Sequence, residues 1–167
     1  PSSPHGLPAL LVKSRMAEAF LTLEAADRLD VLGIAADRLG RPSHLLEKDV
    51  WVVWALQVLF ESAVKDDLVF KGGTSLSKAY GVIDRFSEDV DLTYDIRALV
   101  PDLVEARGDA IPATTSEERR WSRRVREVLP LWVAHSVQPI IMKAIALQGL
   151  QATIRPDGDK LFIDYPP

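Results

Sequence analysis

The feature that most constrains the fold is a pair of glycines between an extended run and a helix-forming run. Leu68-Val69-Phe70 is short and apolar, Gly72-Gly73 follows almost at once, and residues 75–80 favour a helix. This order predicts a strand, a tight turn and a helix, because glycine tolerates backbone angles that other residues avoid. Apolar and polar residues then alternate over residues 89–92, which predicts another strand. We therefore expect an α/β fold in which a small mixed β-sheet packs against helices.

Helical periodicity marks two regions ahead of the first strand. Through about residue 40, apolar residues recur at helical spacing, and Gly40 ends this region. The next helix, from Glu47 to about Val64, is apolar on nearly every side, which predicts that it packs against several neighbours. We expect an N-terminal helical region, residues 1–46, followed by a core, residues 47–167.

The patterns in the second half of the chain are less regular, beginning with residues 98–114. Residues 98–114 are rich in proline and glycine and predict a loop or partly ordered insertion. Thr115 opens a capping-box pattern, so we expect a helix to about Trp132 that Pro130 bends or ends. Two strand-like runs flank residues 156–159, Pro-Asp-Gly-Asp, which predicts a β-hairpin.

Composition excludes several classes of protein. The 167 residues are 47% hydrophobic and 26% charged, which is typical of a globular chain. The chain contains no cysteine, which excludes disulfides and thiolate zinc sites and agrees with a cytoplasmic location. A net charge of -4 argues against coating nucleic acid through overall charge. The apolar stretch Val50–Phe60 is shorter than the roughly 20 residues of a membrane span, so we expect no membrane association.

The glycine turn is suited to binding a phosphate. Gly72 and Gly73 let a ligand approach the backbone closely, and the first amides of the following helix point outward at the positive end of its dipole. Most glycine turns are structural, so this feature alone is weak. The further donors around the turn are Thr74, Ser75, Lys71 and Lys78.

Two carboxylates follow on the next predicted strand. Asp89 and Asp91 are two residues apart, so both project from one face while Val90 and Leu92 enter the core. Mg²⁺ prefers such oxygen ligands and completes its shell with water and substrate phosphates. A second metal ion would activate an attacking hydroxyl and stabilise the leaving pyrophosphate, which is nucleotidyl transfer.

The acidic pair and the glycine turn also fit two alternatives. A solvated Asp-x-Asp pair without a bound metal is the simplest, and transfer of a γ-phosphate is a further alternative. A P-loop is excluded, because the stretch before Lys78 lacks the second glycine and no serine or threonine follows this lysine.

Two stretches together resemble a known family. Residues 70–78, FKGGTSLSK, and residues 85–92, RFSEDVDL, resemble the AbiEii/AbiGii nucleotidyltransferase toxins, and Glu47-Lys48-Asp49 upstream is also similar to that family. The resemblance is specific over about residues 47–94. It implies a polymerase-β-like nucleotidyltransferase core, incomplete at its C-terminal side and belonging to a longer protein.

The resemblance also implies a function and a set of site residues. The family transfers a nucleotide from an NTP to an RNA acceptor, tRNA for some members, in a Mg²⁺-dependent reaction of a toxin-antitoxin or abortive-infection system with a cognate antitoxin. The implied catalytic residues are Asp89 and Asp91, both as metal ligands, with Ser87; the implied phosphate-binding residues are Gly72, Gly73 and Thr74. Lys48 and Asp49 are either supporting residues or an ion pair at a helix start.

A catalytically inactive module with the same fold is the alternative function. Such a module would bind nucleotide, RNA or a protein partner without transfer. It is favoured by the missing downstream motifs of the family, for which Asp164 is the only candidate third carboxylate. The Asp-Tyr-Pro sequence at this position resembles a segment that precedes the acidic strand of the family.

An arginine cluster surrounds Trp121. Arginine suits phosphate geometry, so the cluster is a candidate RNA-binding surface. The alternative is a solvated helix face, with Trp121 and Val125 packed inward. The residues are Arg119, Arg120, Arg123 and Arg124, followed by Arg126.

Overall fold

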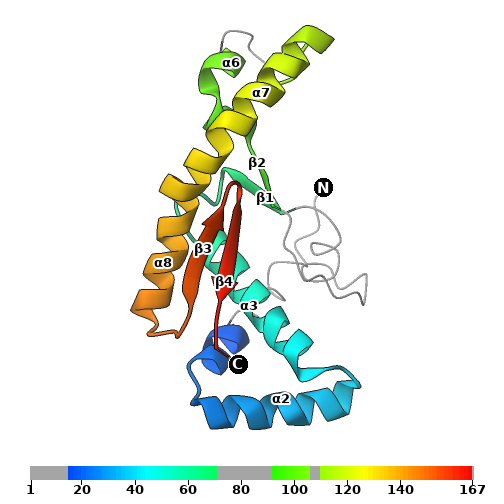
Figure 1. Ribbon diagram of the computed structural model, residues 1–167, viewed down its shortest axis with the longest axis vertical. Coiled ribbons are helices and arrows are strands. Elements are labelled where there is room, and N and C mark those ends of the chain that lie inside the picture. Colours follow the sequence, from blue (N-terminus) through cyan, green and yellow to red (C-terminus); the bar gives the residue numbers. More distant parts are fainter. Residues whose placement is uncertain (1–14, 71–91, 106–109, 167) are drawn as a thin grey trace, which may run out of the picture.

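The computed structural model describes residues 15–70, 92–105 and 110–166. Residues 15–21 are helical. The elements that follow, labelled as in Figure 1, are α2 (Ala25–Leu39), α3 (Ser43–Phe60), β1 (Leu68–Phe70), β2 (Leu92–Tyr94), α5 (Ile96–Leu99), α6 (Pro101–Glu105), α7 (Thr115–Trp132), a π-helical turn (Val133–Val137), α8 (Gln138–Leu147), β3 (Thr153–Asp157) and β4 (Lys160–Asp164).

Helix α2 ends at a glycine in the left-handed conformation, shortly before α3 begins. Gly40 adopts φ 63°, and its N–H donates to the Ala36 carbonyl, so α2 ends where the sequence predicts. The predicted helix from Glu47 to Val64 is shifted: α3 begins at Ser43, directly after Pro42, and ends at Phe60. The expected boundary between residues 46 and 47 lies inside α3, and the division into two regions stays a prediction.

The end of α3 is fixed by a serine. The Ser62 hydroxyl donates to the Leu59 carbonyl over 2.6 Å and accepts from the Val64 N–H over 3.3 Å. Because these local bonds replace helical ones, the chain turns four residues earlier than hydrophobic periodicity indicates. The next segment then enters β1.

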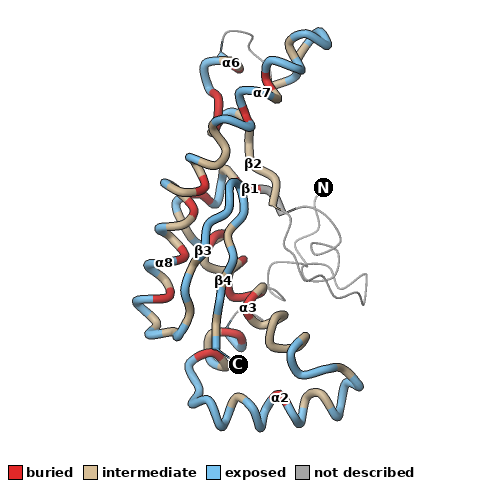
Figure 2. Tube along the Cα trace, viewed as in Figure 1, coloured by how far each residue is buried: buried red, intermediate tan, exposed pale blue. Residues whose placement is uncertain are grey.

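The main core is built around α3. Trp54 is fully buried, and its ring meets that of Trp51 edge-on with centroids 5.4 Å apart. The Trp54 Nε1 donates to Gln148 Oε1 over 2.7 Å, and Gln148 Nε2 donates to Glu18 Oε1 over 2.9 Å. This chain of bonds ties α3 to the end of α8 and to the first helix. Figure 2 shows buried residues gathered on α3 and on the inner side of α8, while α2 is largely exposed.

A second, smaller core corrects the expected loop over residues 98–114. Two short helices, α5 and α6, occupy most of the described part of this stretch, and Val100 between them is 1% exposed. Leu99 and Val100 pack with Val125 of α7. Apolar residues inside a proline-rich stretch thus form a core, because α7 covers them.

Helix α7 begins with a capping box placed one residue earlier than predicted. Thr114 is the N-cap, with Oγ1 accepting from the Glu117 N–H over 3.2 Å, and Glu117 Oε2 accepts from the Ala113 N–H over 3.0 Å. The helix does not end at Pro130, which lies inside α7. After Trp132 the π-helical turn Val133–Val137 continues the helix into α8.

The composite helix Thr115–Leu147 is the longest helical element in the described part of the chain. It contains an 18-residue window that meets the length and composition of a membrane span, of which 22% is buried in the molecule. The apolar composition of this window is explained in part by residues that pack inside the molecule, since Val137, Ile141 and Ile145 are buried in the main core with α3. The absence of membrane association stays a prediction.

Strands form two antiparallel pairs in place of the expected mixed sheet, within the residues that the structure describes. β1 pairs with β2, and β3 pairs with β4. The predicted hairpin is confirmed with a shorter turn: only Gly158 and Asp159 lie outside the strands, and Gly158 has φ 61°. The α/β class is therefore observed in a helix-rich form.

Candidate active site

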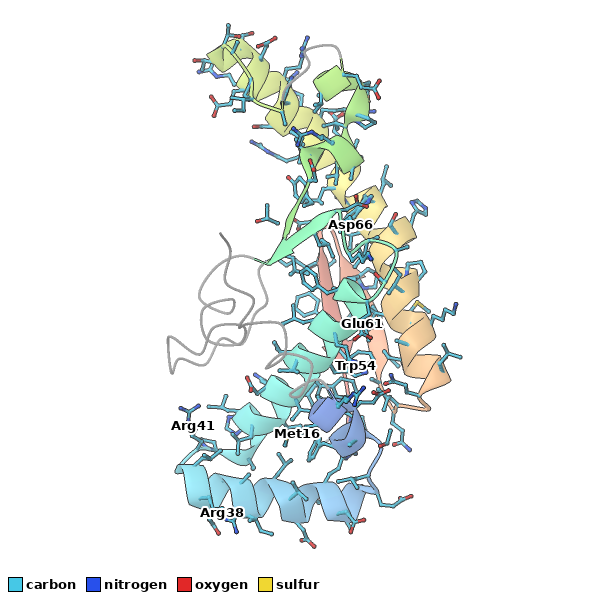
Figure 3. The ribbon with its side chains drawn as sticks, turned by 180° about the vertical axis from the view of Figure 1, so that it is seen from behind. Met16, Arg38, Arg41, Trp54, Glu61 and Asp66 are labelled. Atoms are coloured by element: carbon cyan, nitrogen blue, oxygen red, sulfur yellow. The ribbon has the colours of Figure 1, made fainter. Side chains whose placement is uncertain are left out.

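The β1–β2 pair brings two distant parts of the sequence together. Leu68 pairs with Tyr94, and Phe70 pairs with Leu92. Leu68 is 7% exposed and belongs to the main core, which fixes the pair to the body of the molecule. The chain therefore leaves β1 after Phe70 and returns to β2 at Leu92 at one end of a short antiparallel ladder, whose first strand follows Asp66 in Figure 3.

The predicted catalytic and phosphate-binding residues lie outside the described residues. The glycine motif begins directly after Phe70, and Asp91 directly precedes Leu92. Their positions are predictions that the structure leaves untested. They are Lys71, Gly72, Gly73, Thr74, Ser75, Lys78, Ser87, Asp89 and Asp91.

The other end of this ladder is closed by hydrogen bonds. The Asp95 N–H donates to the Asp67 carbonyl over 2.7 Å, and Asp95 Oδ1 accepts from the Arg97 N–H over 2.9 Å as the N-cap of α5. Sequence reasoning missed this cap, although an aspartate ahead of a short apolar run is a common N-cap signal. The bonds anchor the chain as it leaves β2, so that β2 has little freedom to slide against β1.

The tip of the β3–β4 hairpin lies near β2. Burial raises the pKa of Tyr94 above its usual 10.0, and the negative charge of Asp159 at the hairpin turn raises it further. At the other end of the hairpin, the Tyr165 ring stacks on that of Trp51 with centroids 4.9 Å apart. The hairpin thus extends from the N-terminal half of α3 to the ladder, as Figure 1 shows.

Acidic and histidine side chains are dispersed over the part of the chain that the structure describes. No group of three or more of them there is placed to hold a metal ion. Asp164 Oδ2 accepts from Arg155 Nε over 3.1 Å, and the same arginine lies 4.4 Å from the centroid of the Phe162 ring. Asp164 is thus an ion-pair partner on the exposed face of the hairpin. The chemistry of a hard-oxygen donor set still fits Mg²⁺ at Asp89 and Asp91.

The arginine cluster lies on the exposed side of α7. Trp121 is 3% exposed and Val125 faces the second core, so the inward packing expected of the solvated-face alternative is confirmed. One exposed arginine, Arg124, pairs with Glu127 over 3.6 Å. The arginines Arg119, Arg120, Arg123, Arg124 and Arg126 are all exposed.

Three of these arginines line one side of a shallow depression. Arg119, Arg123 and Arg126 are spaced at i, i+4 and i+7, which places them in one row along the helix. None of the three forms an ion pair with a carboxylate among the described residues. Thr115, Ser122 and one acidic residue, Glu118, complete the depression.

The order of strand, glycine turn, helix and acidic strand that the sequence predicts is typical of nucleotidyltransferases. A family model described as "Nucleotidyl transferase AbiEii toxin, Type IV TA system" matches residues 54–167. The chain belongs to the AbiEii family of type IV toxin-antitoxin systems, and this membership implies a cognate antitoxin as partner. No curated protein and no solved structure matches the chain.

The family match extends further than the stretches that first carried the resemblance. It covers the second core, α7, α8 and the hairpin, as well as both proposed motifs. Lys48 and Asp49 precede it; both are half-buried in the second turn of α3, so neither lies at a helix start. Their supporting role stays a prediction.

Proposed function

We propose that the chain transfers a nucleotide from an NTP to an RNA acceptor, with tRNA as the acceptor class and Mg²⁺ as the metal, in the cytoplasm. The observation that carries the proposal is the pairing of Phe70 with Leu92. Paired residues of an antiparallel ladder lie about 4.5–5.5 Å apart between Cα atoms. The glycine motif and the Asp-x-Asp motif are therefore tethered to neighbouring points at one end of the ladder, as a polymerase-β-like site requires.

Each motif has a distinct task in this proposal. Gly72 and Gly73 approach the triphosphate, and Ser87 supports its binding. Asp89 and Asp91 would hold Mg²⁺, which would supply positive charge to neutralise the phosphates when bound. The acceptor hydroxyl oxygen bonds to the α-phosphorus, its proton leaves to solvent, and the bond to pyrophosphate breaks.

The arginine row of α7 is our proposed contact for the RNA backbone. Arg119, Arg123 and Arg126 are exposed and form no described ion pair, so their charges are available to phosphates. Phosphate contacts position a nucleic acid and supply most of its salt-dependent affinity. Glu118 in the same depression carries the opposite charge and reduces the attraction for phosphates.

Labelled nucleotides test the proposed reaction. The protein is incubated with total RNA, Mg²⁺ and each of the four NTPs carrying an α-phosphate label. We expect transfer of label to RNA, and loss of at least about 100-fold in rate for Asp89→Asn or Asp91→Asn, because a metal ion supplies several kcal/mol of charge stabilisation. Asp66→Asn is the matched control, since Asp66 is an exposed carboxylate that shortly precedes β1.

The same experiment distinguishes the alternatives. Label transfer from the γ-phosphate instead of the α-phosphate would identify a phosphotransferase. Nucleotide binding without any labelled product would identify an inactive module. Equal rates for Asp89→Asn and the Asp66→Asn control would contradict the assignment of the metal ligands.

A further inference from the structure

The three arginines of the α7 row lie opposite the side by which this helix packs. Trp121 is 3% exposed and Val125 belongs to the second core, so both fix the rotation of α7 about its axis. At 100° per residue, Arg119, Arg123 and Arg126 lie about 140–200° around the helix from the buried tryptophan. The row therefore faces away from the second core.

The row is straight, because it is carried by regular helix. Arg119 and Arg126 are seven residues apart, which is about 10.5 Å along the axis at a rise of 1.5 Å per residue. Figure 1 shows the N-terminal half of α7 extending beyond β1 and β2, with α6 beside it. Thr115 and Ser122 lie in the depression next to the row and add hydroxyl groups that can donate to phosphate oxygens. This edge of the molecule is thus a preformed line of groups suited to phosphates.

Helix α7 presents no exposed aromatic side chain. Its two aromatic residues are Trp121, which is buried, and Trp132, which is half-buried and packs against both cores. Proteins that bind single-stranded RNA stack its bases on exposed aromatic side chains, and each stacked base strengthens binding about 5- to 150-fold. A single strand on α7 would have to be ordered without this gain. A duplex is already ordered and presents its phosphates on a fixed surface.

We infer that the α7 row binds the sugar-phosphate backbone of double-stranded RNA, the paired stem of the acceptor, and not a single-stranded segment. The inference rests on the proposed function, which gives the chain an RNA substrate. The wide, shallow minor groove of A-form RNA exposes phosphates and 2′-hydroxyls, so the edge of a helix can approach them closely. Backbone contacts carry no direct sequence information, so α7 recognises the RNA by its shape.

Fluorescence anisotropy without NTP tests the preference for a duplex. The probes are a blunt RNA duplex of about 16 base pairs and each of its separated strands, in sequences that form no internal pairs. We expect the 167-residue chain to bind the duplex at least about tenfold more tightly than either strand. A second duplex of unrelated sequence should bind within about threefold of the first. Equal or tighter binding of a single strand overturns the inference, as does the lack of duplex binding at low salt.

Paired substitutions on the same helix test the row. Arg119→Ala combined with Arg126→Ala should weaken duplex binding at least about tenfold. The matched control is Arg120→Ala combined with Arg124→Ala, which removes the same charge from α7 outside the depression, where Arg124 already pairs with Glu127. The control should weaken duplex binding several-fold less than the row variant does. Circular dichroism checks that both variants are folded, and equal losses in folded variants overturn the inference.

The salt dependence of binding gives a second readout of the row. Each lost phosphate contact should lower the slope of the logarithm of the duplex binding constant against the logarithm of salt concentration by about 0.9. The double variant Arg119→Ala, Arg126→Ala should therefore lose about 1.8 of this slope. A slope that the row variant leaves unchanged overturns the inference.

Failure of this inference and failure of the proposed reaction give different results. Because binding is measured without NTP, a duplex preference that depends on the row supports the inference even if no label is transferred to RNA. Conversely, transfer of label to total RNA by a chain that binds duplex and single strands equally would support the proposed reaction and overturn the inference.

Discussion

The two antiparallel strand pairs of this molecule are built in opposite ways. β3 and β4 are five residues each and are joined by the two-residue turn at Gly158. β1 and β2 are three residues each, and residues 71–91 lie between them in the sequence. The first pair is local and largely exposed, whereas the second is distant in sequence and begins from a buried leucine. The pair that flanks the predicted functional motifs in the sequence is the one that depends on the rest of the fold.

Loop closure explains this dependence. Bringing together the ends of the longer connection costs about 2 kcal/mol more than closing a two-residue turn, by the logarithmic dependence on length. The ladder of β1 and β2 offsets this cost with burial of Leu68 and with the bond from the Asp95 N–H to the Asp67 carbonyl. Substitutions in the two pairs can therefore show which residues stabilise the fold and which take part in the proposed reaction.

Truncation of Leu68 should have the largest effect on stability. Leu68→Ala removes a buried side chain from the main core and should lower the free energy of unfolding by about 2–5 kcal/mol. Ile154→Ala on β3 is the control and should cost less, because Ile154 is only half-buried. Urea unfolding followed by tryptophan fluorescence measures both. Equal costs would show that the two pairs are equally integrated into the core.

Neutralisation of the arginine row tests whether α7, in addition to the region of β1 and β2, takes part in RNA binding. Replacement of Arg119, Arg123 and Arg126 by alanine should weaken RNA binding at least about tenfold. It should also reduce the slope of the logarithm of the binding constant against the logarithm of salt concentration by about 0.7–0.9 for each phosphate contact that is lost. The control replaces Arg38, Lys65 and Lys143, which are exposed and give the same change in net charge. Filter binding at several salt concentrations measures both variants. Equal losses would mean that overall charge, and not this row, binds RNA.

Adding a single methyl group at the hairpin turn should lower the stability of the protein. Gly158→Ala places a side chain at φ 61° with nothing within 4 Å of the added carbon, so strain alone should cost about 1–2 kcal/mol. Gly33→Ala within α2 also meets nothing within 4 Å but should stabilise by up to about 1 kcal/mol. Thermal unfolding of both variants tests the opposite signs. Nucleotide transfer should persist in both if the hairpin is only a scaffold.

Alkaline pH should give the smallest effect. Burial raises the pKa of Tyr165 above 10.0, and the nearby charge of Glu47 raises it further. The unfolded chain therefore loses this proton first, so the contribution of Tyr165 to stability is present below pH 10 and falls as pH rises above it. Tyr165→Phe should flatten the decline in stability above pH 10. Unfolding measured between pH 8 and pH 11 shows whether the slope changes, and an unchanged slope would contradict the shift.

The sequence predicted the parts of the fold that local chemistry determines. Gly40 and Gly158 mark a helix end and a turn because both adopt positive φ. Trp51 and Trp54 are buried on a helix that the sequence predicts to be apolar on nearly every side. For the candidate site, the sequence predicted that β1 ends just before the glycine motif. The register with β2 then placed Leu92, which directly follows the Asp-x-Asp motif in the sequence, beside that end.

Other parts could not be predicted because tertiary contacts determine them. Helices α5 and α6 are four and five residues long, too short for periodicity to show, and they are stabilised by packing with α7. Pro130 lies inside α7 and does not end the helix, which continues through the π-helical turn into α8. The expectation that a proline bends or ends a helix does not take into account the π-helical turn, which the sequence does not reveal.

The uninterrupted passage from α7 through the π-helical turn into α8 has a mechanical consequence. Trp132, near the junction, packs against both cores, so no loop separates the arginine-bearing half from the half that lies against α3. Pro130 and the π-helical turn are the places in this element where a helix bends most readily. A macromolecule bound at Arg119 that tilts α7 would therefore act on α8 through this junction, and α8 is tied to α3 by the bond from Trp54 Nε1 to Gln148 Oε1.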